Sequence, residues 1–138
     1  MTPEERELDA AVAKEVLKLG RVVQGKDYEG SVGPLGFMRP PEPEEWYYCN
    51  TKFITHTGTW TIMDYLPYYS THIYAAWHVV EKMYELGYSY AVAGVPAAND
   101  HQCRFTLYGR LGPVVRAATA PLAICRAALA ALEQANGH

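Results

Sequence analysis

The chain is poor in cysteine, and its cysteines do not pair by position. Cys49, Cys103 and Cys125 are odd in number and lie far apart within 138 residues. A disulfide framework uses an even number of cysteines, and a structural zinc site uses closely spaced ligands. The sequence therefore predicts reduced thiols and no metal site.

A basic start and long apolar runs are also absent. The chain begins Met-Thr-Pro-Glu-Glu, which is acidic, whereas a signal peptide begins with basic residues and an apolar run. No stretch approaches the roughly 18 apolar residues of a membrane-spanning helix. A net charge of −3 gives nucleic acid no general electrostatic reason to bind. We expect a cytoplasmic protein without membrane or general nucleic-acid binding.

Apolar residues recur at helical spacing in three segments, which we interpret as helices with one buried face each. The first spans Thr2 to Leu19 and ends at Gly20. The second begins at Ser70 or Thr71, either of which can cap it, and ends at Gly87. The third is capped by Thr119, with Pro121 in its first turn. The predicted core stripes are Leu8, Ala11, Val12, Val16 and Leu19; Ile73, Trp77, Val80, Met83 and Tyr84; and Leu122, Cys125, Leu129 and Leu132.

The remaining patterned segments are typical of strands. His101, Cys103, Phe105 and Leu107 alternate with polar residues, so one face of that strand is predicted to be apolar. Gly58 is placed where a hairpin turn would need it. The predicted strands are Arg21–Gln24, Trp46–Cys49, Lys52–Thr55, Trp60–Tyr65, Tyr88–Val95 and His101–Arg110.

One domain over residues 1–138 is predicted, of α+β or α/β class, with three helices and a mixed, largely antiparallel sheet. The mixed sheet is expected because a strand–helix–strand passage through the second helix implies a crossover. The pattern leaves open whether all three helices share one face of the sheet. Residues 25–45 are rich in glycine and proline and are predicted to form a long loop, with a binding or lid role as one reading and a plain insertion as the other.

Catalytic patterns are weak. His72 and His78 are six residues apart and fall on different faces of one helix. His101 and Cys103 share a strand face, and Cys49 and His56 lack a third orienting group. No phosphate-binding glycine loop is followed by Lys-Ser/Thr. We therefore expect a non-enzymatic protein without a cofactor, and a hydrolase using His101 or His56 remains the alternative.

Two segments resemble a known family. Tyr69–Met83 (YSTHIYAAWHVVEKM) and Thr119–Leu129 (TAPLAICRAAL) are similar to the phage ABA sandwich domain family, small proteins of phages and prophages. The resemblance covers about a fifth of the chain, in the expected order. It departs at His72, where family members usually carry Asp. The resemblance implies an α-β-α sandwich and a viral context, with the host cytoplasm as the location, but no catalytic residues.

The 11 tyrosines are the unusual part of the composition, and eight aromatic residues lie between Trp46 and Tyr69. Not all of them can be buried, because consecutive strand residues point to opposite faces. Outward aromatics stack on planar ligands or bury protein interfaces, and an arginine binds phosphate in a bidentate manner. The predicted ligand-binding residues are Arg39, Trp46, Tyr48, Lys52, Trp60, Tyr65, Tyr68, Tyr69 and Arg104.

Two functions from different classes follow. The leading hypothesis is a homo-oligomeric binding protein that holds a small nucleotide-like ligand, for example to sequester a host defence signal. The alternative is a protein–protein interaction or structural module of a phage or prophage, acting as a homo-oligomer. Both hypotheses depend on the aromatic residues. In the first they bind a ligand, and in the second they form a protein interface.

Overall fold

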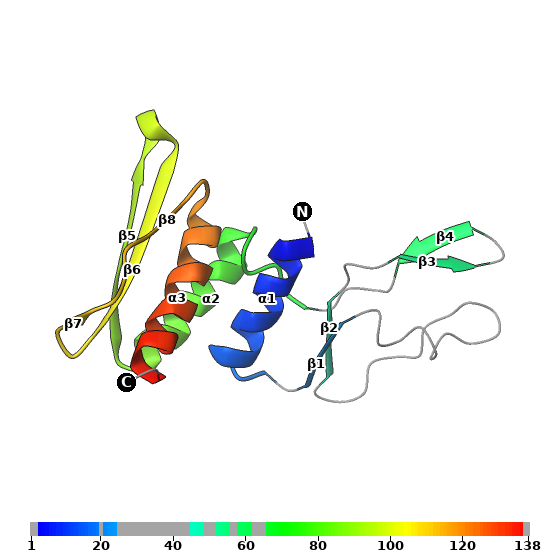
Figure 1. Ribbon diagram of the computed structural model, residues 1–138, viewed down its shortest axis with the longest axis horizontal. Coiled ribbons are helices and arrows are strands. Elements are labelled where there is room, and N and C mark those ends of the chain that lie inside the picture. Colours follow the sequence, from blue (N-terminus) through cyan, green and yellow to red (C-terminus); the bar gives the residue numbers. More distant parts are fainter. Residues whose placement is uncertain are drawn as a thin grey trace.

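The computed structural model in Figure 1 describes residues 3–19, 21–24, 45–48, 52–55, 58–61 and 66–136. Three helices and eight strands lie in these ranges. Their bounds are α1 Pro3–Glu15, β1 Arg21–Gln24, β2 Glu45–Tyr48, β3 Lys52–Thr55, β4 Gly58–Thr61, α2 Ile73–Glu85, β5 Tyr88–Val95, a short 3₁₀ turn Pro96–Ala98, β6 Asp100–Leu107, β7 Arg110–Leu111, β8 Val115–Ala117 and α3 Ala120–Asn136. The loop predicted over residues 25–45 lies outside the described residues, except for Glu45 in β2.

The strands form three separate sheets. β1 and β2 pair in parallel, β3 and β4 pair antiparallel, and the largest sheet is an antiparallel one in which β5 pairs β6 and β6 also pairs β7 and β8. The predicted α+β class, with three helices and a largely antiparallel sheet, is confirmed. The expected crossover through α2 is not formed, because β4 and β5, which flank α2 in the chain, belong to different sheets.

The helices lie on one side of the four-stranded sheet. α3 packs on β6, α2 packs on β5, and α1 packs against α3. In Figure 1 the layers follow one another as sheet, α2 with α3, α1, and then β1 with β2. The arrangement with all three helices on one face is therefore the one that the chain adopts. The β5–β6 hairpin projects beyond the ends of the helices that cover the rest of the sheet.

A buried ion pair joins α1 to the segment before α2. The Arg6 guanidinium contacts the Asp9 carboxylate at 2.5 Å and donates to the carbonyl oxygens of Leu66 and Pro67. Asp9 also accepts from the backbone N–H of Ser70 at 2.7 Å. Because Arg6 and Asp9 are buried, this pair is part of the α1 core face, which the apolar stripe alone did not predict.

The start of α2 differs from the prediction. The N-cap residue is His72, with extended backbone and no side-chain cap hydrogen bond, rather than Ser70 or Thr71. Ser70 is occupied elsewhere, because its hydroxyl donates to the carbonyl of Glu5. Gly87 adopts φ of +100° just after the helix, so the predicted stop is confirmed.

The start of α3 follows the prediction, but its core face does not. The N–H of Leu122 lies 3.4 Å from Oγ1 of Thr119, which confirms the cap. The buried face is made mainly of small residues, whereas Leu122, Leu129 and Leu132 are only half-buried. Alanines on this face let α3 pack between α1, α2 and the sheet. The buried residues of α3 are Pro121, Ala123, Ile124, Cys125, Ala127, Ala128 and Ala131.

Gly58 pairs with Thr55 where β3 and β4 are joined, so it lies at the hairpin connection for which it was predicted, and β4 begins two residues before the predicted start. One turn differs from the prediction. The strand predicted over His101–Arg110 is interrupted at Tyr108 and Gly109, which both have positive φ. Two consecutive residues of that kind make the tight turn that joins twisted antiparallel strands. Tyrosine is uncommon in this conformation, which is why the sequence pattern did not indicate the turn.

Candidate functional site

Three aromatic side chains gather on the exposed side of α2 and β5. The ring of Tyr90 meets the ring of Trp77 edge to face, with centroids 5.8 Å apart, and meets that of Tyr84 at 6.3 Å. Trp77 and Tyr90 are each 42% exposed and Tyr84 is 67% exposed. Edge-to-face geometry is a favoured arrangement of aromatic rings, so the cluster is well packed internally although it faces solvent.

The α2 part of this cluster was predicted to be core. Val80 and Met83 are fully buried, but Ile73, Trp77 and Tyr84 from the same predicted stripe are exposed. Helical geometry explains the difference, because Ile73, Trp77, Val80 and Tyr84 repeat every three or four residues on a face adjacent to the one that meets α3. We call the exposed apolar residues Ile73, Trp77, Tyr84, Tyr90 and Val92 the α2–β5 surface.

A shallow groove lies in the α2–β5 surface. Its volume is about 340 Å³, and it is lined by the three aromatic residues, Val80 and two carboxylates, Glu81 and Glu85. Each carboxylate has a neighbour on the helix, since His78 is 3.6 Å from Glu81 and Lys82 is 3.7 Å from Glu85. The groove therefore combines aromatic faces with an acidic rim.

The strand β5 forms one edge of its sheet. All eight of its residues pair with β6, and no other described strand pairs with it. Only Tyr88 is buried, and Ser89 to Val95 are exposed. The strand carries neither a charged residue nor a proline, which are the usual protections of an edge against pairing with another chain.

Most of the predicted ligand-binding residues fall outside the part of the structure that describes side chains. Arg39 and Tyr65 lie outside the described residues. The structure places four others by their backbone only, and their side chains lie outside the described part of the chain. Trp46 and Tyr48 are in β2, Lys52 is in β3 and Trp60 is in β4.

The three remaining predicted residues do not form one site. Tyr68 stacks on His72 at 5.2 Å, and the Arg6 guanidinium lies 4.2 Å from the centre of its ring. Tyr69 is buried, and burial together with Asp9 and Cys125 raises its pKa to about 12. Arg104 alternates with the buried Cys103 and Phe105, so it points to the face of the sheet away from the helices.

Two cysteines and one histidine of those discussed for catalysis lie in the described part of the chain, namely Cys103, Cys125 and His101. Cys49 and His56 lie outside the described residues. Burial raises the pKa of the Cys103 thiol to about 12 and raises the pKa of the Cys125 thiol still further. The nucleophile is the thiolate, which such thiols do not form near neutral pH. His101 shares the helix-facing side of β6 with Cys103, as predicted, but beside a thiol that stays protonated.

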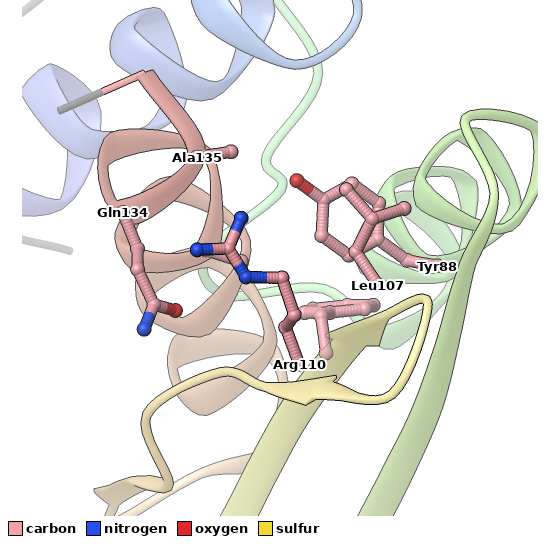
Figure 2. Close-up of a pocket in the computed structure, with 7 residues that line it drawn as sticks. Tyr88, Leu107, Arg110, Gln134 and Ala135 are labelled. Carbon is pink, nitrogen blue, oxygen red and sulfur yellow. The ribbon is translucent and has the colours of Figure 1, made fainter. Parts of the chain in front are cut away.

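A second hollow lies between the β5–β6–β7 end of the sheet and the last turns of α3. Figure 2 shows Tyr88, Leu107, Arg110, Gln134 and Ala135 around it, with the guanidinium of Arg110 between α3 and the ring of Tyr88. Its volume is about 30 Å³. That volume holds about one or two water molecules, so this hollow is too small for a nucleotide.

The aromatic cluster was not among the residues predicted from sequence to bind. Its signal was present, because Glu81 and Glu85 lie close to the predicted core stripe of α2. A fully buried face does not tolerate carboxylates beside it without partners. Carboxylates beside the apolar positions of α2 therefore indicate a stripe that is partly exposed to solvent.

Comparison with known proteins agrees with this architecture. The family model of the phage ABA sandwich domain matches residues 10–129. A crystal structure of a phage protein from Bacillus cereus ATCC 14579 is similar at a TM-score of 0.55, with 22% identity over 94% of this chain and 87% of that one. No curated protein matches the chain. In the described part, none of the helices is long and apolar enough to cross a membrane. The family match covers most of the sequence, and the chain belongs to the phage ABA sandwich domain family.

Proposed function

We propose that this phage-family protein is not an enzyme and that it works by associating with another protein chain through the α2–β5 surface. The observation that carries the proposal is the cluster of Trp77, Tyr84 and Tyr90, which is exposed and lies beside an edge of β5 that no described strand pairs with. Tryptophan and tyrosine are enriched at the centres of protein interfaces, where they contribute most of the binding energy.

The chemistry of the described side chains supports a role without catalysis. The two thiols that the structure describes are buried with raised pKa values. Within the described ranges, no three His, Cys, Asp or Glu side chains gather at one point. A binding role needs neither an activated nucleophile nor such a cluster.

The nucleotide-like ligand remains a prediction of the sequence. The acidic rim of the α2–β5 groove does not favour a phosphate, because Glu81 and Glu85 line the groove. The candidates are Arg104, the half-buried Tyr68 and the predicted residues outside the described side chains. Calorimetry against a panel of linear and cyclic nucleotides tests this hypothesis, with Arg104→Ala as the variant. Heat that is unchanged by the variant contradicts a role for Arg104, and no heat at micromolar protein contradicts the ligand.

The association proposal is tested by placing a photo-crosslinking amino acid at Tyr84. Tyr74 is 88% exposed and does not line the groove, so it is the matched control position on the same helix. We expect irradiation to join the chain to another protein chain from position 84 and not from position 74. The experiment uses the purified protein alone and the protein in a bacterial lysate. Absence of any adduct from position 84 in both contradicts the proposal.

A further inference from the structure

The open stripe of α2 has the spacing of an interface between helices. The exposed Ile73, Trp77 and Tyr84, with the buried Val80 between them, are separated by four, three and four residues, the spacing with which one helix packs on another. α3 covers a different face of α2, so this stripe has no covering helix among the described elements. Because Trp77 and Tyr84 occupy such positions and are exposed, we expect a helix of another chain to pack on them.

The edge of β5 lies next to this stripe and offers a second mode of contact. Its residues Tyr88 to Val95 are neutral, so two copies of the strand meet without like charges. Addition of a strand to an exposed sheet edge is a recurring mode of association, in which main-chain hydrogen bonds supply affinity. One partner chain would satisfy both features only if it presents a strand and a helix side by side.

We propose that the partner is a second copy of this chain, bound across a two-fold axis that pairs β5 antiparallel with β5 and places α2 beside α2. This inference rests on the proposed function and names its partner. An axis perpendicular to the sheet keeps both α2 helices on the same side. Opposed residues of antiparallel strands share a face of the sheet, so the axis passes between the two copies of one residue, which oppose each other. With the axis at Ala91, Tyr90 opposes Val92 of the second copy, and pairs of an aromatic with a β-branched residue favour strand pairing.

The charges of α2 suit this antiparallel arrangement. Both acidic residues, Glu81 and Glu85, are in the C-terminal half of the helix. The first turn contains no acidic residue, and its N-cap His72 makes no side-chain cap hydrogen bond, so no described side chain caps its N–H groups, which favour a negative charge. An antiparallel partner places each acidic half beside the other copy's first turn, whereas a parallel partner would place acid against acid.

The mass of the full chain in solution, measured by light scattering or sedimentation over a range of concentrations, tests the inference. We expect the mass of two chains for the natural sequence. Ala91→Glu and Ala91→Lys each place like charges across the axis and are expected to halve the mass. An equimolar mixture of the two variants is expected to restore the mass of two chains, because opposite charges then meet. Restoration also shows that neither variant failed to fold.

Tyr108→Glu is the control, since it adds the same charge at an 87% exposed position outside α2 and β5 and is expected to leave the mass of two chains unchanged. A natural chain that stays single at high concentration overturns the inference. So does a dimer that persists in both Ala91 variants. The crosslink at Tyr84 separates the two proposals: an adduct only with a different protein overturns the dimer and leaves the association function, whereas no adduct overturns both.

Discussion

The backbone N–H of Ser70 donates to Oδ1 of Asp9 across 61 residues of sequence, at 2.7 Å. The other carboxylate oxygen of Asp9 holds Arg6, which in turn donates to two carbonyls of the segment that leads into α2. Asp9 is therefore the point at which α1 and the start of α2 are joined. All of these groups are buried or part-buried, so their loss is not compensated by water.

Removal of one member of this pair is expected to be more damaging than removal of both. Asp9→Ala leaves the Arg6 charge buried without its carboxylate, and we expect a loss of about 3–5 kcal/mol in the free energy of unfolding. The double variant Arg6→Met, Asp9→Leu is expected to lose less, because it leaves no buried charge. Urea unfolding measures both. A double variant less stable than Asp9→Ala contradicts this account of the pair.

Stability is expected to fall with rising pH above about 9. The thiols of Cys103 and Cys125 and the hydroxyl of Tyr69 have raised pKa values in the folded chain, from ordinary values of 9.0 and 10.0. The unfolded chain therefore loses these protons first, and the free energy of unfolding decreases between pH 9 and about 12. Urea midpoints measured at steps between pH 8 and 11 check the slope. Cys103→Ala should make the slope shallower, and an unchanged slope would contradict the burial of this thiol.

Gly112 is expected to reject even a methyl group. A Cβ at this position would lie 2.2 Å from the carbonyl oxygen of Phe105, which also accepts the Gly112 N–H. We expect Gly112→Ala to cost about 1–3 kcal/mol through backbone displacement. Gly109→Ala is the comparison, since Gly109 has a positive φ but no atom within 4 Å of an added Cβ. Thermal unfolding should rank Gly112→Ala as the less stable variant, and the reverse order would be inconsistent with the contact.

Two threonines near helix starts are expected to respond in opposite ways. Thr119→Ala removes the cap of α3 and should cost about 0.5–1 kcal/mol. The hydroxyl of Thr71 is buried with no hydrogen-bond partner in the described part of the chain. Thr71→Val removes that unpaired group and should leave the free energy of unfolding unchanged or raised. A large loss of stability in Thr71→Val would show that the hydroxyl is paired.

Local signals predicted the elements well. The start of α3 was correct because Thr119 and Pro121 act within one turn, and the end of α2 was correct because Gly87 alone satisfies the backbone there. The sequence did not predict which strands share a sheet. β4 and β5 belong to different sheets, and this depends on contacts between residues that are distant in the sequence. The family and the fold class could therefore be predicted, but not the arrangement of the sheets.

The surface was harder to predict than the fold. Apolar periodicity cannot distinguish a face that meets the chain's own core from one that meets a different chain, which is why Trp77 and Tyr84 were interpreted as core. Arg6 and Asp9 lie in an acidic stretch that is typical of a solvated helix end. Their signal was spacing, because residues 6, 9, 13 and 16 repeat every three or four positions and Ala13 and Val16 are buried.

At the buried alanine positions of α3, this fold tolerates a larger residue less well than a smaller one. A buried alanine contributes little apolar area, so the helix is held by how closely its neighbours approach and not by bulky side chains. Replacing such a residue by glycine removes one methyl group and costs about 1 kcal/mol in helix propensity, whereas lengthening it forces α3 away from α1, α2 and the sheet at once. Among chains that share this fold, positions 123, 127, 128 and 131 should therefore almost never carry a larger residue.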